Sequence, residues 1–261
     1  MDYNQRTMMM YIADAQQRVI KRSFIPGSTG HPEAMIGSSQ TIVNLNQDEV
    51  PLDVASDWLG GNIYWTVSKG KGNGMIMMAK GDGRYKRSVV TSGLYYPTSV
   101  AVDPEHGLMF WSDTGFGPKI ETAQMDGTQR RTIVDTNIGH PEAITIDFSM
   151  DHTIFWVDSK LGTIEMMDHN GNNRHVVARG SSGNLRKPVS IDVFESNMFW
   201  VNSEDGSVVQ QDKFGRGVPV SIAKNLPNPR AIRVLHQFRY YFTIFGCIYS
   251  HFCPQKLPSL H

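Results

Sequence analysis

The chain has 261 residues, and its 25 Lys and Arg balance its 25 Asp and Glu, so the net charge is zero. This balance argues against nucleic acid as a partner, because binding to phosphates requires a basic excess. The 24 Gly and 13 Pro indicate many turns, and long amphipathic helical patterns are absent. Cys247 and Cys253 are the only two cysteines, so their spacing does not decide between compartments.

The two ends of the chain give no sign of export or of a membrane crossing. The segment Met1 to Met10 has no basic stretch followed by an apolar one, so no signal peptide is predicted. The longest apolar stretch, Tyr240 to Phe252, is shorter than the ~20 residues that a membrane-spanning helix needs. We therefore predict no membrane span within this chain.

An aromatic segment recurs along the chain and decides the fold prediction. Ile63-Tyr64-Trp65-Thr66-Val67 returns three times, with tryptophans at Trp111, Trp156 and Trp200, and successive tryptophans are 46, 45 and 44 residues apart. A degenerate copy at Met10 to Asp14 has Ile12 in place of the tryptophan. Such a period is typical of architectures built from repeated supersecondary units.

A second motif begins with proline and precedes each aromatic segment. Pro97-Thr-Ser-Val-Ala-Val-Asp103 matches residues 141–147 and 51–57, and residues 188–194 are a weaker copy without the final Asp. The last copy, residues 229–235, is followed by no aromatic-Trp segment. Alternating strands and Asx-Gly turns then complete each period, as at Asp126-Gly127.

Each period therefore predicts four short antiparallel strands, which is one blade of a β-propeller. We predict an all-β fold with five of six four-stranded blades, the sixth being represented only by its first strand at residues 229–235. The predicted domains are an irregular N-terminus (1–7), an incomplete propeller (8–237) and a short irregular tail (238–261).

The repeated tryptophans and aspartates are expected to have structural roles. Each large ring buries about 150–250 Å² between adjacent blades, and the carboxylates accept hydrogen bonds from turn amides and hydroxyls. The residues in question are Trp65, Trp111, Trp156, Trp200, Asp14, Asp57, Asp103, Asp113, Asp147 and Asp158.

These motifs resemble the YWTD propeller, the class B repeat of the low-density lipoprotein receptor family, over residues 8–237. The chain departs from the family pattern where Val67 and Asn202 replace the motif Asp and Ile12 replaces Trp. The resemblance implies the extracellular part of a type I plasma-membrane or endosomal receptor. It also implies binding of protein ligands or neighbouring receptor modules, with acid-triggered release during endocytosis. Calcium is expected only in neighbouring modules, and no cofactor in this chain; the two cysteines are expected to be remnants of an EGF-like module.

Ligand sites in propellers lie on the face made by the loops after the second and fourth strands of each blade. The exposed-type side chains predicted on these loops are aromatic or charged, as interface hot spots are. They are Tyr95, Tyr96, Phe116, His140, Glu142, Arg186 and Asp205. His140 is the preferred candidate for a pH switch, because imidazole changes charge between pH 5 and 8.

Two other functions remain open from the sequence. A matrix adhesive propeller of the nidogen type would carry the same repeats. A calcium-dependent lactonase or esterase would need acids converging near the start of each first strand. Only Glu142 is acidic at those positions, the others being Leu52, Thr98, Val189 and Arg230, so we predict that the chain is not an enzyme and holds no metal.

Overall fold

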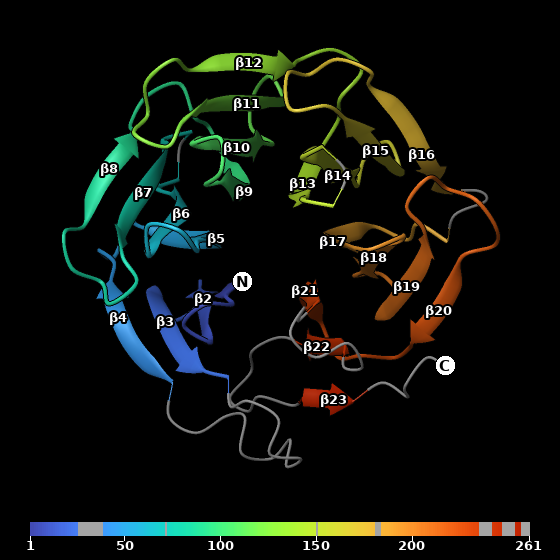
Figure 1. Cartoon of the computed structure of the whole chain (residues 1–261), viewed down its shortest axis with the longest axis horizontal. Coiled ribbons are helices and arrows are strands. Elements are labelled where there is room, and N and C mark those ends of the chain that lie inside the picture. The colour runs from blue at the N-terminus through green and yellow to red at the C-terminus, as the bar shows by residue number, and fades with distance from the viewer. Residues whose placement is uncertain are drawn as a thin grey trace. The chain divides into compact units, whose positions relative to one another are not determined.

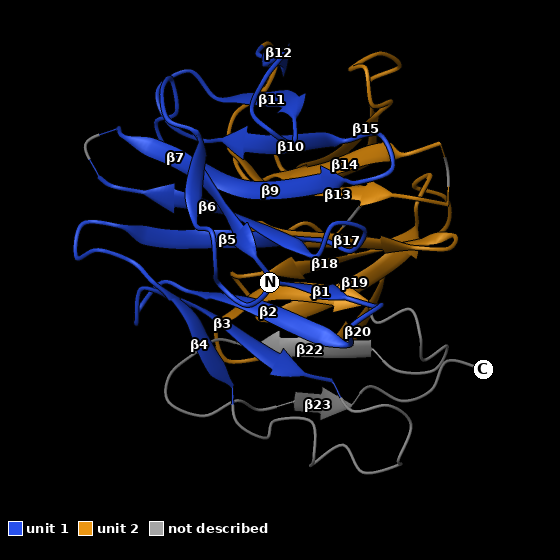
Figure 2. Ribbon diagram, turned by 60° about the vertical axis from the view of Figure 1, so that its left-hand side comes forward, with its two compact units in different colours: residues 1–135 blue, residues 136–261 orange. Residues whose placement is uncertain are grey.

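The computed structural model describes residues 1–25, 39–70, 72–149, 151–180, 184–234, 242–246 and 254–256. The elements of these described residues are all β-strands. The chain divides into two compact units, residues 1–135 and 136–261 (Figure 2). No helix in the described residues has the length and apolar character that a membrane crossing requires.

Unit 1 contains three sheets of four antiparallel strands, and we call each such sheet a blade (Figure 1). The first blade consists of β1 (Asp2–Asn4), β2 (Met9–Asp14), β3 (Val19–Phe24) and β4 (Gln40–Asn44). The second consists of β5 (Val50–Asp57), β6 (Asn62–Ser68), β7 (Gly74–Lys80) and β8 (Arg87–Val90). The third consists of β9 (Pro97–Asp103), β10 (Leu108–Asp113), β11 (Lys119–Gln124) and β12 (Arg131–Val134).

Unit 2 contains two further blades and a three-stranded sheet. The fourth blade consists of β13 (Pro141–Asp147), β14 (Thr153–Asp158), β15 (Thr163–Met167) and β16 (His175–Arg179). The fifth consists of β17 (Pro188–Phe194), β18 (Asn197–Asn202), β19 (Ser207–Asp212) and β20 (Val220–Ala223). The last sheet consists of β21 (Pro229–Val234), β22 (Phe242–Gly246) and β23 (Pro254–Lys256). The predicted fold class, all-β with five four-stranded propeller blades, is confirmed.

The tryptophans of the second, third and fifth blades lie on the second strand and face the preceding blade of the same unit. Trp111 lies opposite Val100 of β9 and Glu121 of β11, and it packs in one cluster with Tyr64 and Ile76 of the second blade. Trp65 joins the first and second blades in the same way, and Trp200 joins the fourth and fifth. All four tryptophans, including Trp156, are 0% exposed. Adjacent blades within a unit are therefore held by a dry aromatic layer, which a single four-stranded sheet could not form alone.

Two segments differ from the prediction. The N-terminus, predicted to be irregular, contains β1, which pairs with β2 and completes the first blade. The tail, also predicted to be irregular, contains β22 and β23, and β22 pairs with β21, which we had expected to lack companion strands. The residues of β22 are Phe-Thr-Ile-Phe-Gly, and β-branched and aromatic residues favour strands wherever an unpaired edge is available. Leu235, Cys247 and Cys253 lie outside the described residues.

Candidate functional site

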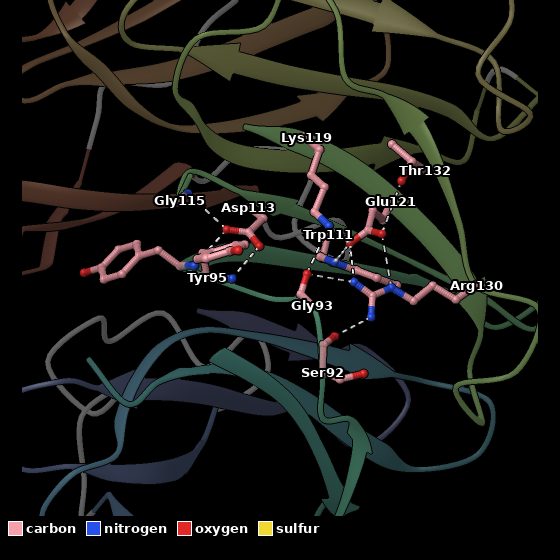
Figure 3. A network of polar contacts seen from close by, with 11 residues as sticks. Ser92, Gly93, Tyr95, Trp111, Asp113, Gly115, Lys119, Glu121, Arg130 and Thr132 are labelled. Carbon is pink, nitrogen blue, oxygen red and sulfur yellow. Dashed lines mark hydrogen bonds and ion pairs between the residues drawn. The ribbon is translucent and has the colours of Figure 1, made fainter. Parts of the chain in front are cut away.

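The aspartate that ends the second strand fixes two loops at once. In the third blade, the Asp113 carboxylate accepts hydrogen bonds from the amides of Tyr95 (2.8 Å) and Tyr96 (2.7 Å), which belong to the loop before β9. It also accepts one from the amide of Gly115 (3.0 Å) in the loop after β10 (Figure 3). One buried carboxylate therefore holds together the two loops that form the predicted ligand face of this blade.

Asp158 does the same in the fourth blade with a larger set of donors. Its carboxylate accepts bonds from the amides of Gly139 (2.6 Å), His140 (2.9 Å), Lys160 (3.0 Å) and Leu161 (2.9 Å). The Asp158 side chain is completely buried, so its carboxylate accepts these bonds out of contact with water. The loop before β13 and the loop after β14 thus depend on a single charged acceptor.

The fifth blade replaces this aspartate by Asn202, and the amide side chain keeps part of the role. Its Oδ1 accepts a bond from the amide of Arg186 (3.0 Å), while its Nδ2 donates to the carbonyl of Asn184 (2.7 Å) and to the hydroxyl of Ser207 (3.0 Å). An asparagine therefore still joins the preceding loop to the following turn.

The second blade replaces the aspartate by Val67, and another side chain takes over. Glu49, in the loop before β5, accepts a bond from the amide of Asn46 (3.0 Å) and an ion pair from Lys69 (3.0 Å) in the loop after β6. Burial alone would raise the pKa of Glu49, but the Asn46 amide and the Lys69 charge outweigh it and hold the pKa below its ordinary value. Glu49 was not among the residues predicted from the sequence, where the only signal was the missing aspartate at Val67.

The aspartates that end the first strands cap the turns that follow them. Asp57 accepts bonds from the amides of Leu59 and Gly60, and Asp103 from those of Glu105 and His106. Asp147 accepts bonds from the amide and the hydroxyl of Ser149, and it forms a buried ion pair with Lys213 at 2.5 Å.

Asp14 ends the second strand of the first blade, where it accepts bonds from the amide of Gln17 and the ammonium of Lys21. Each of these carboxylates accepts its hydrogen bonds from groups of its own unit.

A network of charged side chains covers Trp111 and was also missed from the sequence (Figure 3). The indole Nε1 donates to Glu121 (3.2 Å), and the guanidinium of Arg130 lies 5.4 Å from the ring centroid. Arg130 also binds Glu121 (2.6 Å) and the carbonyls of Ser92 (2.5 Å) and Gly93 (3.1 Å). The fourth blade repeats the cation–π contact and the ion pair with Trp156, Arg174 and Glu165, but the Trp156 Nε1 has no hydrogen-bond partner in the described residues. A Glu and an Arg at matched positions of the two repeats were the signal in the sequence.

This network gives an expected pH dependence of stability. Burial would raise the pKa of Glu121, but hydrogen bonds and charges from Arg130 and Lys119 outweigh burial and lower the pKa below its ordinary value of 4.5. A carboxyl with a lowered folded-state pKa stabilises the fold above its unfolded pKa and loses that contribution as pH falls through the folded one. Urea midpoints of the parent and Glu121→Gln should therefore differ at pH 7 and converge as the pH falls below 4.5 and through the lowered folded-state pKa.

The control for this measurement is Glu195→Gln, since Glu195 is exposed on a turn. Its urea midpoint should follow that of the parent at every pH. A Glu121→Gln deficit that stays constant down to acid pH would contradict the assigned ionisation.

The aromatic candidates lie exposed on two loops of unit 1. Tyr95 and Tyr96 are 43% and 45% exposed, and Phe116 is 87% exposed. The rings of Tyr95 and Phe116 meet edge to face with centroids 6.2 Å apart. Both rings extend from loops that Asp113 holds, so they are presented on a fixed backbone. We call these three residues the aromatic surface.

The charged candidates lie in unit 2 and form two separate pairs. His140 Nδ1 is 2.9 Å from the Glu142 carboxylate, which also accepts a bond from the Ser159 hydroxyl (2.8 Å). Arg186 and Asp205 form an exposed ion pair at 3.6 Å. His140, Arg186 and Asp205 lie on the predicted loops, whereas Glu142 is half-buried at the start of β13.

Comparisons with known proteins find relatives that carry the same kind of repeat. Residues 107–148 match the family model described as the low-density lipoprotein receptor repeat class B. Low-density lipoprotein receptor-related protein 5 of Mus musculus is 30% identical over 109 residues, which cover 42% of this chain and 6% of that protein. The low-density lipoprotein receptor-related protein 5-like protein of Homo sapiens is 27% identical over 116 residues, covering 44% of this chain and 41% of that protein. The chain thus spans less than half the length of these relatives.

Two solved structures share the fold. A chain in the crystal structure of a nidogen/laminin complex has a TM-score of 0.70 and 28% identity, covering 81% of this chain and 74% of that one. A luciferin-regenerating enzyme has a TM-score of 0.70 at 9% identity, covering 94% and 82%, and shows a likeness of fold alone. Residues 107–148 are therefore similar to the class B repeat of the low-density lipoprotein receptor family, and longer parts of the chain are similar to the two receptor-related proteins and to the chain of the nidogen/laminin complex.

Proposed function

We propose that this chain is a protein-binding module of an extracellular receptor of the low-density lipoprotein receptor type. The family match, the receptor relatives and the likeness to a chain from a nidogen/laminin complex support this proposal. The narrower resemblance of residues 213–240 to the membrane-proximal propeller of megalin, the low-density lipoprotein receptor-related protein 2, belongs to the same proposal.

The observation that carries the proposal is the aromatic surface of unit 1. Exposed aromatic rings on a rigid backbone are the side chains that most often dominate protein interfaces, because they bury a large area at a small cost in conformational entropy. Phe116 is nearly fully exposed, although an isolated exposed ring of this size gains nothing for stability. A partner that covers Phe116 together with Tyr95 and Tyr96 would recover this apolar area.

The proposed receptor binds its ligand at neutral pH and releases it in endosomes, and His140 is the residue we assign to this step. Its ring faces the Glu142 carboxylate and the Ser159 hydroxyl, and its amide is held by the Asp158 carboxylate. Protonation of the ring would convert the His140–Glu142 contact into a full ion pair and so change the charge of this loop.

The experiment compares the proteins retained by the immobilised chain from serum and from a laminin preparation, identified by mass spectrometry. Phe116→Ser should lose at least one protein that the parent retains at pH 7.4. The matched control is Tyr85→Ser, because Tyr85 is 75% exposed but lies on the turn between β7 and β8. Release at pH 5.5 should occur from the parent and be reduced in His140→Gln. Identical sets of retained proteins for the parent and Phe116→Ser would contradict the proposed surface.

The other two functions are separated by simple observations. A full-length transcript without a membrane anchor would favour the matrix adhesive function, which the nidogen/laminin structure makes a specific candidate. Stoichiometric binding of calcium to the chain would favour the lactonase or esterase. We propose a non-enzymatic role because the matched proteins are receptors and the likeness to the luciferin-regenerating enzyme extends only to the fold.

A further inference from the structure

The segment that joins β7 to β8 carries three basic side chains in a fixed pattern. Arg84-Tyr85-Lys86-Arg87-Ser88 has basic residues at its first, third and fourth positions, and it is the one segment of the sequence that reads Arg-Xaa-Lys/Arg-Arg. The third blade has Thr128-Gln129-Arg130-Arg131-Thr132 at the same distance from its turn glycine, without the first basic residue. The full pattern is therefore a departure of the second blade from the repeat.

The whole segment from Arg84 to Ser88 is exposed. The Arg84 guanidinium donates to the Asp82 carboxylate (2.7 Å), yet 72% of the Arg84 side chain remains accessible to solvent. The Lys86 ammonium reaches a carbonyl oxygen at a long 3.5 Å, and Arg87 makes no hydrogen bond or ion pair within the described residues. Exposed contacts of this kind contribute little stability, so all three cations are available to a partner.

The acidic side chains near the segment do not neutralise it. Asp82 is partly exposed, and its pair with Arg84 lies at the surface. The charge of Arg87 also acts on Asp126, but this exposed carboxylate already accepts bonds from the amide (2.8 Å) and the hydroxyl (2.6 Å) of Thr128. An enclosed carboxylate on a partner attracts a cation more strongly than these solvated ones do, because water screens them.

The backbone of the segment lies where the blade opens most easily. β8 is the last strand of its sheet (Figure 1), and it pairs with β7 through Arg87 and Ser88 before a bulge interrupts the ladder. Tyr85 has a φ of +57°, which a bulky side chain rarely adopts. Short edge strands open locally at a lower free energy than the core of a sheet does, and opening here releases the strain at Tyr85.

We propose that the peptide bond between Arg87 and Ser88 is a cleavage site for a serine protease with acidic subsites for the first, second and fourth residues before the bond. These subsites accept charge-assisted bonds from Arg87, Lys86 and Arg84. The protease serine attacks the Arg87 carbonyl carbon, the C–N bond breaks, and Ser88 leaves as an amine that takes a proton from the protease histidine. Water then hydrolyses the acyl ester, which releases the Arg87 carboxylate and restores the serine. Neither the aromatic surface nor its partner takes part in this reaction.

The cleaved chain is expected to stay together, because the core of unit 1 joins both sides of the bond. Tyr64 and Ile76 precede the bond and Val90 and Trp111 follow it, and all four side chains are buried in one cluster. Burial of large apolar side chains stabilises an association whether or not the chain is continuous. Cleavage therefore converts the protein into a two-chain form that keeps its blades.

The test incubates the full-length chain with furin, a purified protease of this specificity, and identifies the products by mass spectrometry. Fragments 1–87 and 88–261 should appear after denaturation and should elute as one species from a size-exclusion column before it. Arg84→Gln should slow this cleavage at least ~tenfold, because a charged subsite is left without its partner. The control Arg6→Gln, at another exposed arginine of unit 1, should leave the rate unchanged.

Thr128→Arg tests whether exposure, in addition to sequence, defines the site. It gives the third blade the same basic pattern, but Arg130 there is half-buried and its guanidinium is held by Glu121 (2.6 Å). Cleavage after Arg131 in this variant should therefore be at least ~tenfold slower than cleavage after Arg87.

Three results would overturn the proposal: no fragment that ends at Arg87, an unchanged rate in Arg84→Gln, or equally fast cleavage after Arg131 in Thr128→Arg. Separate elution of the two fragments before denaturation would contradict the two-chain form. The elution volume of each variant before digestion reports whether it is folded. Retention of partners by the aromatic surface is measured independently with Phe116→Ser, so failure of either experiment leaves the other standing.

Discussion

Replacing Trp111 by alanine is expected to lower the free energy of unfolding by about 3–5 kcal/mol, as for large aromatic side chains truncated in a core. The ring is completely buried between the second and third blades. Its loss also removes the indole bond to Glu121 and the cation–π contact with Arg130. The change is measured as a shift of the urea midpoint.

Tyr85→Ala is the control for this measurement. Tyr85 is an aromatic residue that is largely exposed, so its truncation should change the free energy of unfolding by less than about 0.5 kcal/mol. If Trp111→Ala unfolds at the same urea concentration as the parent, the ring does not hold the two blades together.

Asp158→Ala is expected to have an effect of similar size, about 3 kcal/mol or more, although it removes few atoms. Four backbone amides lose their acceptor, and the amide of Gly139 is in a buried contact with the carboxylate. A buried donor without an acceptor costs more than the bond itself contributes. Urea unfolding again measures the loss.

The comparison that makes this result specific is Asp158→Asn. Asn202 shows that an amide at the equivalent position of the fifth blade keeps the bond to the preceding loop. Asp158→Asn should therefore cost less than half as much as Asp158→Ala. Equal losses for the two variants would mean that packing around the side chain, not acceptance of the amides, is responsible.

The sequence predicted the blades well because their determinants are periodic. A tryptophan every 44–46 residues and a proline at the start of each first strand repeat in register, so each copy supports the others. The loops that carry Tyr95, Tyr96 and Phe116 were predicted for the same reason, since their places relative to the repeat are fixed.

The parts that were not predicted depend on residues that break the repeat or lie far apart. Glu49 takes over from the missing aspartate at Val67, and nothing in the local sequence indicates that these two positions are linked. Lys213 binds Asp147 although 66 residues separate them. The strands β1 and β22 were missed because they lack the aromatic-Trp and proline motifs on which the prediction relied.

The proposed function depends on different residue types in different places. Buried tryptophans and aspartates build the blades and fix the loops, and the exposed rings of the aromatic surface are left for the proposed partner. Loops with a fixed backbone lose little entropy on binding, which favours recognition by a preformed surface. Asp113 and Asp158 accept backbone amides with both carboxylate oxygens, which is the structural role predicted for them.

The most direct measurement is amide hydrogen exchange of Tyr95 and Tyr96, followed residue by residue in the parent and in Asp113→Ala. The central claim is that one repeated carboxylate fixes the loops that carry the aromatic surface. The amides of Tyr95 and Tyr96 should exchange at least ~tenfold more slowly than that of Phe116, which has no acceptor in the described residues, and Asp113→Ala should abolish the difference. Exchange of Tyr95 and Tyr96 as fast as Phe116 in the parent would contradict the claim.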